Sequence, residues 1–142
     1  MTPAELPFDE VVLLDFEFSG PPGERPRPVC LVAWELRSGR RFRVWLDELA
    51  AMSHPPFAVG DGVLFVAFYA SAEVTCFLSL GWAPPRHLLD LFTEFRCLTN
   101  GRSLPCGNGL LGAATFFGLS AISAEDKAGL RALAQQVEWD SE

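Results

Sequence analysis

Two carboxylates near the amino terminus have the spacing of a possible reaction site. The run VVLLDFEFSG, residues 11–20, places Asp15 and Glu17 two positions apart after four apolar residues. In a β-strand such residues point to the same face, so both acids would lie side by side at the end of a buried strand. Like charges held this close repel, and a hard divalent cation such as Mg²⁺ or Mn²⁺ would relieve the repulsion. Taken alone, two acids that face water at a strand end are the simpler interpretation.

A third acid lies where an apolar strand is expected to pass into a helix. In FYASAEV, residues 68–74, Glu73 falls in the first turn of that helix. The helix dipole favours an acid there, so a capping role is the simpler interpretation of Glu73 by itself. The alternative is a metal ligand at the carboxyl end of a strand, where the sites of α/β proteins usually lie.

Hydrophobic patterning predicts the elements that must position these acids. Strands are expected at 11–18, 29–37, 40–47 and 62–68, with a fifth strand or the start of a helix at 87–92. Helices are expected at 47–52, at 71–81 with Ser71 as its N-cap, at 109–119, and at 123–136 with Ser123 as its N-cap. The Ser38-Gly39 turn joins the second and third strands, so the first three form an antiparallel meander. The strand at 62–68 should pair parallel to the first, giving an α/β fold with a mixed sheet flanked by helices.

Composition narrows the classes of protein that the chain could represent. Its 142 residues are about half apolar and predict one domain, 1–142. A net charge of −7 argues against coating nucleic acid by bulk charge, yet six of the eleven basic residues fall between Arg25 and Arg43. None of the four cysteines forms a C-x-x-C pair, so a zinc site has little support. No signal peptide or membrane-spanning run is visible, and the expected location is the cytoplasm.

The order of these motifs resembles the DnaQ-like (DEDD) 3′–5′ exonuclease family, which includes the proofreading domains of DNA polymerases. DFE at 15–17 matches the family's first motif, and AFYASAEV matches the second, with Glu73 where the family usually has aspartate. Asp90 in HLLDLF matches an aspartate that the next strand of the family often carries. The resemblance spans about residues 11 to 119 and implies a ribonuclease H-like fold.

The resemblance also implies a function. It predicts metal-dependent 3′–5′ exonuclease action on single-stranded DNA or RNA ends, by two-metal-ion phosphodiester hydrolysis with Mg²⁺ or Mn²⁺. Asp15 would bridge the ions, and Glu17 and Glu73 would complete their shells. Binding of the strand would use stacking and a few basic contacts. The candidates for substrate binding are Phe18, Tyr69, Arg25 and Arg27; core packing and a solvated loop are the competing interpretations of these residues.

The family's last motif, a tyrosine or histidine followed by an aspartate on a C-terminal helix, has no match. The single tyrosine, Tyr69, falls in the second motif, and Asp126 and Asp140 lack a suitable neighbour. The domain is therefore expected to be truncated before its last catalytic helix, so that a partner chain or a downstream segment would supply the fourth acid. The alternative function is a catalytically silent, exonuclease-like module for binding or assembly.

Overall fold

The computed structural model describes residues 5–21, 23–119 and 124–134. These residues belong to two compact units, 1–91 and 92–142. The first unit holds β1 (Glu10–Ser19), β2 (Arg27–Glu35), β3 (Arg41–Trp45), α1 (Leu46–Ala51), β4 (Val63–Ala67), α2 (Ala70–Ser79) and β5 (His87–Asp90). The second holds α3 (Leu91–Leu98, of which Leu91 still belongs to the first unit), α4 (Leu110–Phe116) and α5 (Ala124–Ala134).

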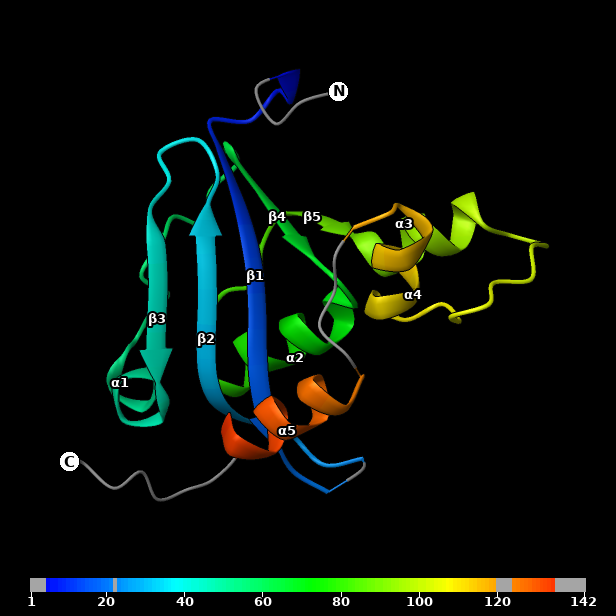
Figure 1. The fold of residues 1–142 in the computed structure, drawn as a ribbon. Helices are drawn as coiled ribbons and strands as arrows, with labels where there is room; N and C mark the ends of the chain where they lie inside the picture. Colours follow the sequence, from blue (N-terminus) through cyan, green and yellow to red (C-terminus); the bar gives the residue numbers. More distant parts are fainter. Residues whose placement is uncertain (1–4, 22, 120–123, 135–142) are drawn as a thin grey trace. The chain divides into compact units, whose positions relative to one another are not determined.

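The five strands of the first unit form one mixed sheet in the order β3-β2-β1-β4-β5, and Figure 1 shows them side by side. β1 pairs antiparallel with β2, and β2 pairs antiparallel with β3. β4 pairs parallel with β1 and with β5. The antiparallel meander, the parallel pairing of the fourth strand and the mixed sheet flanked by helices are therefore confirmed.

The main hydrophobic core lies on one face of this sheet. Alternate residues of β1 point into it, among them Val12, Leu14 and Phe16, as expected for a strand with one buried face. α2 covers these side chains with Phe77, whose ring meets Phe16 edge-on with centroids 5.8 Å apart. α1 adds the fully buried Leu49. Burial of these side chains fixes the register of β1, because a slip by one residue would turn Phe16 outward and Asp15 inward.

The opposite face carries a smaller apolar cluster. Val11, Leu64 and Val66 are buried there, and Leu13 packs against them. The strands and the loops beside them supply this cluster, and among the described residues neither α1 nor α2 contributes to it. Asp15 follows Leu13 on this face, so Asp15 and Glu17 lie on the face of the sheet opposite the main core.

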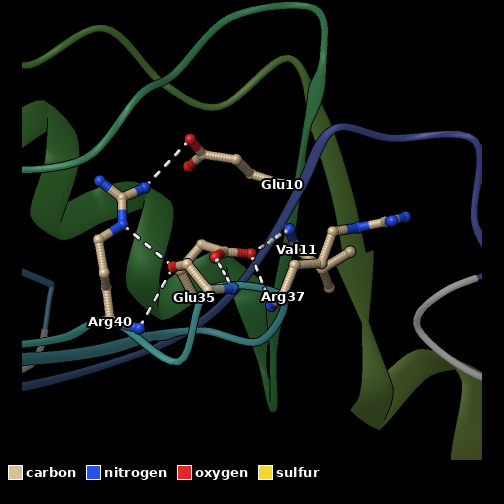
Figure 2. Close-up of polar contacts among 6 residues, drawn as sticks. Glu10, Val11, Glu35, Arg37 and Arg40 are labelled. Carbon is tan, nitrogen blue, oxygen red and sulfur yellow. Dashed lines mark hydrogen bonds and ion pairs between the residues drawn. The ribbon is translucent and has the colours of Figure 1, made fainter.

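Glu35 anchors the turn between β2 and β3 (Figure 2). Its side chain is only 1% exposed, and its carboxylate accepts hydrogen bonds from the backbone N–H groups of Val11, Arg37 and Ser38 at 3.3, 2.9 and 2.6 Å. Burial alone would raise the pKa of Glu35, but these bonds and one from the Ser38 side chain lower it to about 2. Gly39 completes the turn with a φ of 74°, a conformation that glycine adopts without strain.

The secondary structure described in the second unit consists of helices joined by turns and loops. Phe95 of α3 is buried against Phe116 and Phe117 at the end of α4, with ring centroids 5.5 and 6.1 Å apart. Residues 87–92 were expected to form a fifth strand or the start of a helix, and they contain both, since β5 ends at Asp90 and α3 begins at Leu91. The single domain over 1–142 stays a prediction. In the described part of the chain, no helix has the length and apolar character that crossing a membrane requires.

Two expected helix caps have different outcomes. Ser71 was expected to cap the helix at 71–81, and this is wrong: α2 begins at Ala70, its N-cap is Tyr69, and Ser71 lies inside the first turn. The Tyr69 backbone turns the chain two residues earlier by adopting a left-handed conformation. Ser123 lies outside the described residues, so its capping role stays a prediction.

Candidate functional site

The candidate site lies where β1 extends beyond the end of its pairing with β4. The parallel pairing of the two strands ends at Leu13 opposite Val66, whereas β1 continues to Ser19 alongside β2. Asp15 and Glu17 lie on this overhang, which β4 leaves without a partner strand on one side. A backbone N–H on such an edge has no partner strand, so it needs another hydrogen-bond acceptor if it is shielded from water.

Glu73 supplies that acceptor. Its Oε2 receives a hydrogen bond from the backbone N–H of Phe16 at 2.8 Å, between the two acids of β1 in sequence. The chain reaches this point because β4 leads directly into α2, whose first turn carries Glu73. The side chain is only 4% exposed, so its carboxyl group lies in the protein interior beside β1.

Burial and the two acids of β1 keep a proton on Glu73. Desolvation is the largest cause that raises its pKa, and the charge of Asp15 raises it further. The hydrogen bond from Phe16 acts in the opposite direction, the charge of Glu17 adds to the rise, and the pKa reaches about 8. Three carboxyl groups from two distant segments are therefore electrostatically coupled, and Glu73 is largely neutral at pH 7.

The register of the sheet places Asp15 and Glu17 on one face. Asp15 is exposed and lies opposite Val32, whereas Glu17 is half-buried and lies opposite Cys30. Burial raises the pKa of the Cys30 thiol, a backbone hydrogen bond at Glu17 lowers it, and the charges of Glu17 and Asp15 raise it. Cys76, one turn after Glu73, has a pKa raised to about 12 by burial and by the charges of Glu73 and Asp15. Both thiols therefore stay protonated next to the acids.

The junction between β4 and α2 has an unusual backbone. Tyr69 has a φ of 75°, and it is the only residue other than glycine with a positive φ in the part of the chain described. Its backbone N–H donates to Oδ1 of Asp90 at 3.1 Å, which ties the junction to the end of β5. A large side chain in the left-handed region is strained, and such strain clusters at functional sites.

The four candidate substrate-binding residues lie in three places. Tyr69 is 53% exposed at the N-cap of α2, four residues before Glu73 in sequence. Phe18 follows an irregularity in the β1–β2 pairing and packs against the main core, so core packing describes it better. Arg25 and Arg27 are both exposed in and after the connection from β1 to β2, at the end of β1 that carries Glu17.

The acids have the right chemistry for a metal ion but not a finished coordination geometry. Carboxylate oxygens are the ligands that Mg²⁺ and Mn²⁺ prefer. However, within the described residues no three His, Cys, Asp or Glu side chains are placed to hold one ion. One oxygen of Glu73 is engaged with Phe16, and the group must lose its proton before it can act as a ligand.

Asp90 is the residue that the predicted site left out. Sequence reasoning matched it to a family aspartate but gave it no role among the site residues. In the structure it lies level with Ala67 at the carboxyl end of β5 and accepts the bond from Tyr69. The sequence signal was an acid at the end of an apolar strand, the same signal that singled out Asp15 and Glu17.

Comparison with solved structures identifies the fold. The chain is similar to Escherichia coli RNase D, described as an exoribonuclease involved in structured RNA processing, with 17% identity and a TM-score of 0.51. It is also similar to the EXO domain of Aedes aegypti Nibbler, with 15% identity and a TM-score of 0.45. The alignments cover 82% and 67% of this chain but only 30% of RNase D and 50% of the Nibbler chain. The first likeness shows the ribonuclease H-like fold expected from sequence. No protein-family model matches the chain. A search of curated proteins also finds no match.

Proposed function

We propose that this chain is a 3′–5′ exonuclease domain of the DnaQ-like type that acts in the cytoplasm on single-stranded DNA or RNA ends. The observation that carries the proposal is the buried Glu73, which α2 brings to the backbone between Asp15 and Glu17. A structural acid would be expected to find a cationic or fully hydrogen-bonded environment, as Glu35 does. Glu73 instead faces two further carboxylates, which only a cation or a proton can stabilise.

The residues of the chain divide the work of the proposed reaction. Asp15, Glu17 and Glu73 would hold Mg²⁺ or Mn²⁺, two ions in this proposal, whose chemistry is to activate a water and steady the leaving oxygen. Glu73 would act as a ligand only after it lost its proton, and its raised pKa makes that loss unfavourable unless a positive charge lies nearby. Asp90 fixes the Tyr69 backbone, so that the exposed ring can stack on a terminal base. Arg25 and Arg27 extend from the adjoining connection toward solvent and would contact phosphates.

A fourth acid is also required by the proposed family mechanism. Asp126 of α5 is exposed, and Asp140 lies outside the described residues. We propose that a partner chain or a downstream segment supplies this acid together with the residue that orients the water. Without them, positioning and electrostatics are incomplete, so turnover by the 142-residue chain should be slow.

The second candidate function is a catalytically silent module that binds nucleic acid or assembles with another protein. The observation that favours it is the absence, among the described residues, of a three-ligand group ready to hold a metal ion. The two candidates differ in their response to Asp15→Asn. This change abolishes cleavage by an enzyme, whereas binding by a silent module should persist or become tighter as negative charge is lost.

A strand-polarity assay tests the proposal. The purified chain is incubated with Mn²⁺ and a single strand labelled at its 5′ end, once as such and once with a phosphorothioate-blocked 3′ terminus. The proposal predicts a ladder of products shortened from the 3′ end, lost with the blocked strand, with chelator and with Asp15→Asn. Asp61→Asn, at an exposed acid paired with Arg86, is the matched control and should cleave normally. Products that persist in Asp15→Asn, or no cleavage even after a helix carrying Y-x-x-x-D is added at the carboxyl end, would exclude an exonuclease that uses these acids.

A further inference from the structure

The open face of β2 and β3 carries two tryptophans and two arginines. The pairing of the strands sets them in rows, because residues opposite each other point to the same face. Trp34 lies opposite Leu13 and Arg41, and Val32 lies opposite Asp15 and Arg43. In the third row Cys30 lies opposite Glu17 and Trp45. The face that presents the acids on β1 therefore continues sideways into aromatic and cationic side chains.

The apolar side chains on this face are accessible to solvent. Trp34, Trp45 and Val32 are 39%, 44% and 49% exposed. Their sequence neighbours Ala33 and Val44 point to the other face of the sheet and are buried in the main core. The Arg41 guanidinium lies over the ring of Trp34, 4.9 Å from its centroid. Arg43 is exposed in the middle row, and within the described residues neither arginine is joined to a carboxylate by an ion pair.

We propose that this surface, the β2–β3 platform formed by Val32, Trp34, Arg41, Arg43 and Trp45, binds single-stranded nucleic acid. The tryptophan rings supply planes on which bases stack, and the stacked Arg41 guanidinium is itself such a plane. Arg43 supplies a phosphate contact between the two aromatic rows. The inference deepens the proposed function, since the platform would hold the part of a strand that leads away from the acids, but binding there requires no cleavage.

Charge favours nucleic acid over a protein helix as the occupant. The whole chain has a net charge of −7, which repels a polyanion everywhere except where positive charge gathers. The platform is such a place, because both of its charged members are arginines. A surface for an apolar helix would gain nothing from the guanidinium groups of Arg41 and Arg43, whereas a strand of phosphates and bases needs both aromatic and cationic contacts.

Binding without cleavage tests the platform directly. Fluorescence anisotropy of a short fluorescein-labelled oligouridine or oligothymidine is measured with chelator present, so that no metal-dependent reaction occurs. Trp34→Ala should weaken binding by about fivefold or more, the loss expected for one stacked base, while Trp34→Phe should keep most of the affinity. Arg43→Ala should reduce the slope of log K against log salt by about 0.7. Arg86→Ala, at an arginine that is 67% exposed and paired with Asp61, should change neither quantity.

The outcomes separate this proposal from the proposed activity. No binding by the parent chain, or equal affinity in the parent, Trp34→Ala and Arg43→Ala proteins with unchanged circular dichroism, would overturn the platform. A self-association that Trp34→Ala abolishes, without any oligonucleotide binding, would also overturn it and identify a second copy as the occupant. Platform binding that persists in Asp15→Asn, with no cleavage by the parent chain or by the chain extended with the Y-x-x-x-D helix, would leave the platform standing and remove the exonuclease.

Discussion

The backbone N–H of Phe16 donates to the carboxylate of Glu73 at 2.8 Å, across 57 residues of sequence. This bond replaces the strand pairing that β1 loses when β4 ends, and it brings a buried acid between two others. The same side chain thus completes the hydrogen bonding of the sheet and concentrates negative charge. Its structural role and its proposed chemical role can be separated by substitution.

Glu73→Gln and Glu73→Ala should have different effects on stability. Glutamine keeps an acceptor for the Phe16 N–H and removes the charge, so the free energy of unfolding at pH 8 should stay equal or rise. Alanine leaves a buried donor without an acceptor, which should cost about 1–3 kcal/mol in addition to the lost packing. Urea denaturation of both variants measures the difference. Equal destabilisation by the two changes would mean that the hydrogen bond contributes nothing.

Stability in metal-free solution should fall as the pH rises from about 4.5 to about 8. The folded state binds the Glu73 proton more tightly than the unfolded state, because the pKa of the group rises from its ordinary 4.5 to about 8 on folding. Between these values the folded chain carries one more proton, so the free energy of unfolding decreases by up to about 1.4 kcal/mol per pH unit. Urea midpoints across this range check the slope, and subtraction of the Glu73→Gln profile isolates this group from the two histidines. A difference profile without slope would contradict the raised pKa.

Glu35 should contribute to stability in the opposite pH direction. Its pKa is lowered to about 2, so its contribution is present above the ordinary value of 4.5 and is lost as the pH falls toward 2. At neutral pH, Glu35→Ala should reduce the free energy of unfolding by on the order of 3 kcal/mol, because charge-assisted bonds to three backbone N–H groups disappear. Asp61→Ala, which removes an exposed ion pair, should cost less than about 1 kcal/mol. Similar losses in the two variants would show that the carboxylate does not anchor the turn.

The alternation of apolar residues sufficed to predict much of the sheet and the placement of Asp15 and Glu17 on one face, since a strand with a buried face allows only one register. It also predicted that Glu73 would follow the fourth strand. It could not predict the bond from Phe16 to Glu73, because that bond depends on how far β1 extends beyond β4. The residue at which the pairing of two strands stops is a tertiary property that no local pattern encodes.

The local signals at the start of α2 were also misleading. Ser71 is a favoured N-cap residue, yet the N-cap of α2 is Tyr69. The backbone N–H of Tyr69 donates a hydrogen bond to Asp90 at the end of β5. No local pattern predicted the role of Glu35, because its carboxylate binds three backbone N–H groups that come together only after the sheet has formed. In each case a contact between distant segments outweighs the local preference.

Tyr69→Gly should separate strain from function. Glycine adopts a φ of 75° freely, so the substitution should leave the free energy of unfolding unchanged or raise it by up to about 1 kcal/mol. The same change removes the exposed ring and should weaken binding of a 3′ end and slow any cleavage. Thermal denaturation and cleavage kinetics measure the two effects, with Leu78→Ala at an exposed position on α2 as the control. A clear loss of stability would mean that the ring is held for packing rather than for a ligand.

If Asp15, Glu17 and Glu73 form one cation site, anomalous diffraction from crystals soaked in Mn²⁺ should reveal it. We expect one or two Mn²⁺ peaks, roughly 3.5–4 Å apart if two, bonded to carboxylate oxygens of Asp15 and of at least one of the two glutamates. Asp15→Asn crystals under the same conditions should lose them. A site without a peak at saturating Mn²⁺, or a peak elsewhere while Glu73 remains hydrogen-bonded to Phe16, would exclude a cation site at these acids and leave Glu73 as a structural residue.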